Sequence, residues 1–245
     1  MIRSRELKQD EQEILGTFGR VHDDTEVPWG ERTGILLVHG RAGDEKVMWV
    51  FSKAIENIKG IILSPRAIIP DPIGGFSWWL LPGVTSIESS SENKYQEISI
   101  NHASSPSAKN SFKPGVETIL RASEMLVTNY GVHPDKRIAI GFSQGAALVG
   151  SASLMNPCIF AKVVLLAGFI PEVVLAEFQF NSIDIMPEYF ISHGTEDQVV
   201  AFNRAVLCRD YLIQKGARVT FHSDKVGHKI SASGIKALSE WFHQT

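Results

Sequence analysis

Cysteine is scarce in this chain, and no charge of one sign dominates it. The 245 residues include only two cysteines, Cys158 and Cys208, each inside an apolar or helical segment. We therefore expect two free, packed thiols in a reducing, cytoplasmic compartment rather than a disulfide framework. The formal net charge is −3, from 24 Lys and Arg against 27 Asp and Glu, so nothing suggests a nucleic-acid partner.

Long apolar stretches are missing as well. The longest apolar run, residues 163–171, is too short to span a bilayer, so no transmembrane segment is expected. Residues 1–13 are charged throughout and have no apolar core, so no signal peptide is expected in them. The hydrophobic content of 44% and charged content of 21% fit a single globular α/β domain over residues 1–245.

Short apolar runs alternate with segments of helical spacing along most of the chain. Strands are expected at 33–38, 61–64, 137–142, 162–168, 189–192 and 218–222, with an edge strand at 13–21 after a frayed start. Helices are expected at 45–59, 114–130, 144–155, 202–215 and 230–243, with Gly60, Gly131 and Gly216 closing three of them. This alternation predicts a mostly parallel, doubly wound sheet with helices on both faces.

The sequence Gly141-Phe142-Ser143-Gln144-Gly145 joins one of these strands to an Ala-rich helix. A sharp turn from strand to helix holds its central residue in a strained conformation, and the flanking glycines clear the space around it. Ser143 is thus predicted to project above the sheet as a nucleophile. A tight turn with a bystander serine is the alternative.

A serine nucleophile needs a base, and the base needs an orienting carboxylate. In a doubly wound sheet such residues lie on loops at the carboxyl ends of strands. Asp197 follows the strand at 189–192, and His228 follows the strand at 218–222. The order Ser143, Asp197, His228 along the chain is that of the α/β-hydrolases.

Other acids and histidines fit these roles less well. Glu196 would point elsewhere on its turn, and Asp184 precedes its strand. Asp224 is too close in sequence to the candidate base, so we expect a turn residue. His222 lies within a strand, and we expect His193, at a strand end, to stabilise its turn by a hydrogen bond.

The loop His39-Gly40-Arg41 follows the strand expected beside the Ser143 strand. In this architecture a backbone N–H of that loop and the N–H after the nucleophile form the oxyanion hole. Arg41 and Gln144 are therefore the predicted donors, through their backbones. The Arg41 side chain could meet an acidic substrate group or be a solvated loop arginine.

Residues 71–113 form a long stretch rich in Ser, Gly and Pro, expected to cover the site as a loop. It contains an aromatic cluster, Phe76, Trp78 and Trp79. These rings could line a substrate pocket, with Trp78 or Trp79 touching the acyl or alcohol group. They could equally belong to the core.

Taken together, the motifs resemble the phospholipase/carboxylesterase family of α/β-hydrolases, which includes the acyl-protein thioesterases. The matching stretches are 38–40 with 43–44, 65–67, 141–146, 193–200 and 227–228. The resemblance implies a metal-free, cofactor-free hydrolase of carboxylic esters, thioesters or lysophospholipids, with Ser143, Asp197 and His228 as triad. It also implies an oxyanion hole from the N–H groups of Arg41 and Gln144.

The chain departs from the family pattern at two places. Arg41 stands where a hydrophobic residue is common, and Ser77-Trp78-Trp79-Leu80 keeps the aromatics of a family element but lacks its aspartate. Two alternatives stay open: a small serine peptidase or amidase, and a slow, hydrolase-fold ligand-binding protein. The oligomeric state, including a homodimer, is also open.

Overall fold

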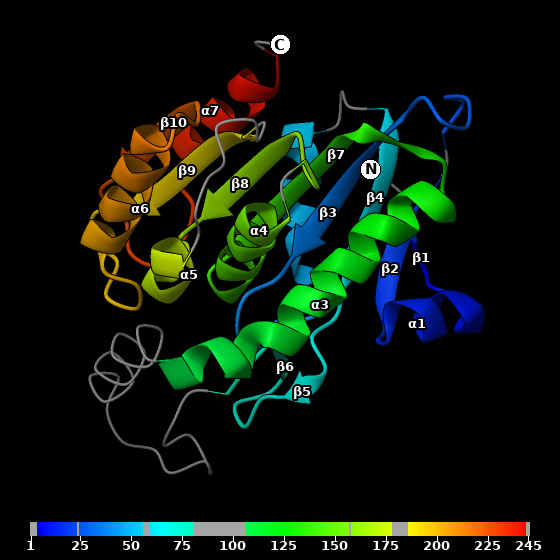
Figure 1. The fold of residues 1–245 in the computed structure, drawn as a ribbon, viewed down its shortest axis with the longest axis horizontal. Helices are drawn as coiled ribbons and strands as arrows, with labels where there is room; N and C mark the ends of the chain where they lie inside the picture. Colours follow the sequence, from blue (N-terminus) through cyan, green and yellow to red (C-terminus); the bar gives the residue numbers. More distant parts are fainter. Residues whose placement is uncertain are drawn as a thin grey trace.

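The computed structural model describes residues 4–23, 25–55, 59–80, 106–156, 158–177 and 186–243. Its centre is an eight-stranded sheet in the order β1-β2-β4-β3-β7-β8-β9-β10 (Figure 1). The strands are β1 (Arg5–Glu6), β2 (Gly19–His22), β3 (Arg32–Val38), β4 (Gly60–Pro65), β7 (Val132–Phe142), β8 (Lys162–Leu166), β9 (Glu188–Gly194) and β10 (Val219–Asp224). Strands β4, β3, β7, β8, β9 and β10 pair in parallel, and β1 and β2 are antiparallel at one edge, which confirms the predicted α/β fold.

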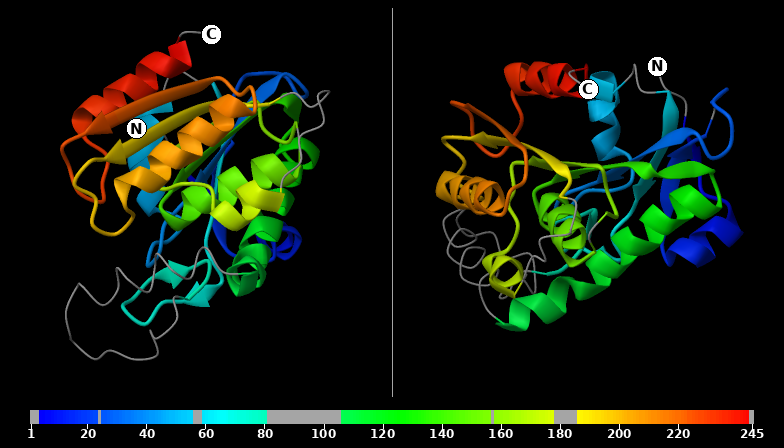
Figure 2. Two further views of the ribbon diagram at one scale, coloured as in Figure 1. Left: turned by 60° about the vertical axis from the view of Figure 1, so that its left-hand side comes forward. Right: turned by 45° about the horizontal axis from the view of Figure 1, so that its top comes forward.

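Helices cover both faces of the sheet (Figure 2). One face carries α1 (Gln9–Leu15), α3 (Pro106–Thr128), α4 (Gln144–Met155), α5 (Glu172–Glu177) and α6 (Phe202–Gln214). The other face carries the 3₁₀ helix η1 (Val47–Ile55) and α7 (Ala232–His243). None of the helices in the described ranges is long and apolar enough to cross a membrane.

The alternation of side chains along a strand explains why β3 reads as a continuous apolar run. Leu36 and Val38 pack into the core under α3 and α4, and Ile35 and Leu37 pack into the core under η1 and α7. All four side chains are fully buried. A central strand with apolar residues on both faces can only be stable between two helix layers.

The amino-terminal prediction was wrong. Residues 9–15 form helix α1, and the edge strand is limited to Gly19–His22. A buried carboxylate ties this region to the domain: Glu11 accepts hydrogen bonds from Arg5 Nη1 at 2.7 Å and from Tyr130 Oη at 2.7 Å. Burial would raise the pKa of Glu11, but these bonds outweigh it and lower the pKa to about 2.

The segment after β3 also differs from the prediction. In place of an α-helix over 45–59, a 3₁₀ helix spans Val47–Ile55, and Gly60 begins β4. A Cβ at Gly60 would lie 2.3 Å from the Thr33 carbonyl oxygen, so this glycine allows close strand pairing and does not cap a helix. Gly131 and Gly216 have positive φ and end their helices as predicted.

The covering segment is partly regular. Residues 69–77 form a hairpin of β5 (Ile69–Pro70) and β6 (Phe76–Ser77), and α3 already begins at Pro106. The predicted loop therefore ends earlier than residue 113. Residues 81–105 lie outside the described residues, as does Asp184. Of the two free thiols, Cys208 is buried as expected, but Cys158 is exposed.

Candidate active site

Ser143 stands at the junction of β7 and α4, where the chain turns sharply. Its backbone adopts φ 52° and ψ −114°, a strained conformation for a residue with a side chain. Two flanking glycines make the turn possible. A Cβ at Gly141 would lie 2.3 Å from the Gly145 carbonyl oxygen, and one at Gly145 would lie 2.1 Å from the Val38 carbonyl oxygen. Only glycine fits at either position.

The structure brings Ser143, His228 and Asp197 together. The Nε2 atom of His228 lies 3.0 Å from Ser143 Oγ, and its Nδ1 atom lies 2.8 Å from Asp197 Oδ2. Asp197 follows β9 and His228 lies between β10 and α7, both at the carboxyl edge of the sheet. A carboxylate accepting the Nδ1–H leaves Nε2 free to accept the serine proton.

Asp197 is held on both carboxylate oxygens. Oδ1 accepts the backbone N–H groups of Val199 and Val200 at 2.8 and 2.9 Å, and Oδ2 also lies 3.2 Å from His193 Nε2. Burial would raise the pKa of Asp197, but the hydrogen bonds from His193 and His228 outweigh it and hold the pKa well below its usual range. The carboxylate is therefore ionised and fixed in orientation.

His222 and His193 lie in strands as predicted, whereas Asp224, expected in a turn, is the last residue of β10. His193 Nε2 lies 2.9 Å from the Val200 carbonyl oxygen, so it does stabilise its turn. Asp224 accepts hydrogen bonds from Ser231 and Ser233 and lies 2.7 Å from His222 Nε2. Asp224 thus anchors the start of the loop that carries the candidate base.

The loop after β3 passes directly beside Ser143. A Cβ at Gly40 would lie 3.1 Å from Ser143 Cβ, so the two backbones are in close approach. His39 is fully buried and shapes this loop: its Nε2 accepts the Ala67 N–H at 3.0 Å, and its Nδ1 lies 2.7 Å from the Gly40 carbonyl oxygen. The Nδ1–H tautomer satisfies both contacts.

The Arg41 side chain has a partner that the sequence did not suggest. Its Nε and Nη2 atoms donate to Asp71 Oδ2 and Oδ1 at 2.8 and 3.1 Å, and the Asp71 side chain is fully buried. Arg41 is therefore not a solvated loop arginine, because its guanidinium is paired with a buried carboxylate. Asp71 was missed because only its position, between Pro70 and Pro72 on a loop, set it apart.

The aromatic cluster is largely internal. Trp78 and Trp79 are 2% and 9% exposed and lie in the hydrophobic core, and Phe76 is half-buried with the Arg66 guanidinium 4.2 Å from its ring centre. The burial favours the core interpretation for Trp78 and argues against its touching substrate. Substrate contact by Phe76 and Trp79 stays a prediction.

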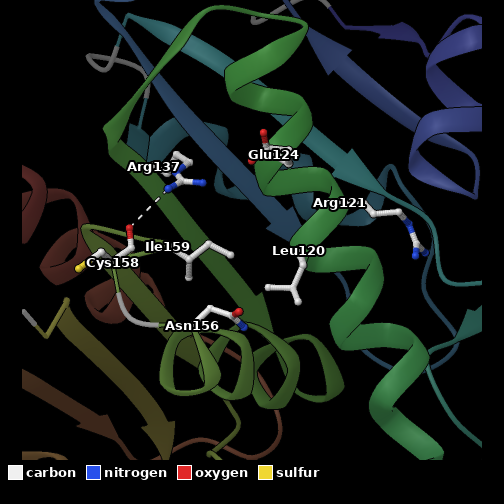
Figure 3. A pocket seen from close by; sticks show the side chains of 7 residues that line it. All are labelled: Leu120, Arg121, Glu124, Arg137, Asn156, Cys158 and Ile159. Carbon is white, nitrogen blue, oxygen red and sulfur yellow. Dashed lines mark hydrogen bonds between the residues drawn. The ribbon is translucent and has the colours of Figure 1, made fainter. Parts of the chain in front are cut away.

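A cavity of about 560 Å³ lies between α3 and the loop from α4 to β8 (Figure 3). Its walls include Leu120, Arg137 and Ile159, near the amino end of β8 and the last turn of α4. Ser143 lies at the opposite end of α4, so this cavity is not part of the candidate active site. Within the described ranges, no group of three or more His, Cys, Asp or Glu side chains could hold a metal ion.

Residues 30–245 match the family described as phospholipase/carboxylesterase. The chain belongs to this family. The resemblance expected from the motifs is thereby confirmed.

Two curated relatives and one solved structure show the range of similarity. An acyl-protein thioesterase 1 of Yarrowia lipolytica is 28% identical over 120 residues, 48% of this chain and 53% of that protein. A probable carboxylesterase SOBER1-like of Arabidopsis thaliana is 27% identical over 219 residues, 87% of this chain and 79% of that protein. The chain thus spans about half the length of the first relative.

A crystal structure of a carboxylesterase from Mesorhizobium loti superposes with a TM-score of 0.70 at 19% identity. The superposition covers 99% of both chains. This likeness establishes the fold.

Proposed function

We propose that the chain hydrolyses carboxylic esters through an acyl-enzyme formed on Ser143. His228 takes the serine proton as general base and later protonates the leaving group, and Asp197 holds the imidazole in the useful tautomer. The observation that carries this proposal is that His228 contacts both partners: its Nε2 lies 3.0 Å from Ser143 Oγ, and its Nδ1 lies 2.8 Å from Asp197 Oδ2.

The backbone N–H groups of Arg41 and Gln144 are the proposed oxyanion donors. Gln144 opens helix α4, where unpaired N–H groups and the helix dipole favour negative charge. The close approach of Gly40 to Ser143 supports the second donor, because Arg41 is the next residue on that loop. Removing one such donor typically costs about 10²–10³ in rate.

The names of the relatives suggest esters or thioesters as substrates. A cytoplasmic location also remains a proposal, supported by the two free cysteines. An amide would need a protonated leaving group in the same site, so we expect slower turnover of amides.

The test uses p-nitrophenyl esters of several chain lengths, a matched p-nitroanilide and a fluorophosphonate probe. Ser143→Ala should abolish ester turnover and labelling, whereas Ser223→Ala, an exposed serine on β10, should leave both unchanged. Full esterase activity in Ser143→Ala would refute the site. Equal rates on the ester and the anilide would favour the amidase alternative.

A further inference from the structure

The two proposed oxyanion donors lie on different loops, and one segment is bonded to both. Residues 71–79 run from the turn of the β5–β6 hairpin to the buried tryptophans. They contact the loop of Arg41 at one end and the side chain of Gln144 at the other.

At the first end, an ion pair and a hydroxyl hold the Arg41 loop. Asp71 binds the Arg41 guanidinium through two hydrogen bonds and accepts the Ser77 hydroxyl at 2.7 Å. Ser77 Oγ in turn accepts the Ala42 N–H at 3.2 Å. Ala42 has φ 58°, a strained value for alanine, which persists only where its surroundings enforce it.

The Asp71 carboxylate keeps its charge in this setting. Burial would raise the pKa of Asp71, but the hydrogen bonds from Arg41 and Ser77 hold it below its usual range. Paired, bidentate arginine–carboxylate contacts are geometrically strict, so the pair fixes the loop in direction as well as in distance.

At the second end, the Gln144 side chain is buried, and both its oxygen and its nitrogen are hydrogen-bonded. Its Oε1 accepts the Trp78 N–H at 3.1 Å, and its Nε2 donates to the Trp79 carbonyl at 3.0 Å. The Trp78 indole N–H also donates to the His39 carbonyl at 2.8 Å, two residues before Arg41. The side-chain amide of Gln144 is thus bonded to residues 71–79, the same segment that holds the Arg41 loop.

We infer that residues 71–79 act as a brace that sets the spacing between the two oxyanion donors, with Asp71 and the Gln144 side chain as positioning residues. This inference rests on the proposed function. Donors stabilise an oxyanion only within a narrow range of distance, and a displacement of about 1 Å can cost about 100-fold in rate. A brace therefore acts on kcat rather than on substrate binding.

The experiment compares Asp71→Asn and Gln144→Met, each in the full chain, on a p-nitrophenyl ester below the melting temperature. Gln144→Met keeps the backbone N–H and removes only the side-chain bonds. Each variant should lower kcat about 10- to 100-fold with KM changed less than about threefold. Asp135→Asn, an exposed aspartate near the start of β7, is the matched control and should keep wild-type kcat.

The double variant separates a brace from two local effects. Asp71 and Gln144 are bonded to opposite ends of the segment, so independent effects on kcat would multiply. One brace released at either end predicts a double variant within about threefold of the slower single variant. Multiplied losses, or single variants with wild-type kcat and a lowered Tm, would overturn the inference.

Two further arms complete the test. If Asp71→Asn does not fold, Ser77→Ala, which removes one hydroxyl from the same end, should lower kcat about three- to tenfold, and an unchanged kcat there would overturn the inference. Ser143→Ala is measured alongside. If it retained full activity, the proposed function itself would fail, whatever the brace variants did.

Discussion

Replacing Asp197 by asparagine should disable the site through the tautomer of its base. The carboxylate Oδ1 accepts two backbone N–H groups, from Val199 and Val200. An asparagine would keep its carbonyl oxygen there, because an amide NH₂ cannot accept these bonds. Its NH₂ group would then face His228 Nδ1, which must offer a lone pair to it. The imidazole proton would move to Nε2, directed at Ser143 Oγ.

A base with its proton toward the nucleophile cannot accept the serine proton. The loss associated with this wrong tautomer is about 10⁴-fold in kcat. At about 1.4 kcal/mol for each factor of ten, the transition state would lose about 5 kcal/mol of stabilisation. KM should change little, because Asp197 is fully buried and has no surface for substrate contact.

The assay is kcat for a p-nitrophenyl ester, with fluorophosphonate labelling as a second measure. Glu196→Gln is the matched control, since Glu196 is the adjacent carboxylate, exposed and 3.6 Å from Lys225. It should retain kcat within about twofold, as surface substitutions usually do. If Asp197→Asn kept more than about a tenth of wild-type kcat, the role assigned to Asp197 would be wrong.

Two further predictions concern stability. Glu11→Gln should cost about 1–3 kcal/mol at pH 7 by removing partners of Arg5 and Tyr130. The pKa of Glu11 is about 2 in the folded protein and about 4.3 in the unfolded chain. The ionised carboxylate therefore contributes its full stabilisation above about pH 4.3 and loses it as the pH falls toward 2. The difference in Tm between wild type and variant should therefore shrink as the pH falls from 6 to 2, and a constant difference would contradict it. Trp78→Ala should cost about 3–5 kcal/mol and lower Tm without changing ester chain-length preference; an altered preference at wild-type Tm would instead support direct substrate contact.

The nucleophile turn could be predicted from sequence because its constraints are local. Gly141, Ser143 and Gly145 are fixed by steric contacts that involve only a few ångströms of backbone. Asp197 and His228 required one further step, the rule that parallel strands end at one edge of a sheet. Spacing and strand order are visible in a sequence, so the three residues that the structure brings together could be selected from it.

The brace could not be predicted in the same way. Arg41 and Asp71 are 30 residues apart, and an ion pair between two loops leaves no periodic or spacing signal. The same limit explains the error at the amino terminus. Hydrogen bonds among Arg5, Glu11 and Tyr130 tie helix α1 to the domain, and the sequence of residues 9–21 alone does not contain these contacts. Interactions of this kind depend on the tertiary fold that they help to stabilise.

Two histidines lie near the candidate site in different surroundings: His228 contacts Ser143, and His39 precedes Gly40, which approaches the same serine. The proposed general base, His228, is 20% exposed. His39 is fully buried, and burial lowers its pKa to about 4. It stays neutral above that value, with its Nδ1–H on the Gly40 carbonyl and its Nε2 on the Ala67 N–H. The Gly40–Arg41 peptide carries a proposed oxyanion donor, and its orientation is therefore independent of pH near neutrality. Any change of kcat/KM in that pH range must arise from groups other than His39.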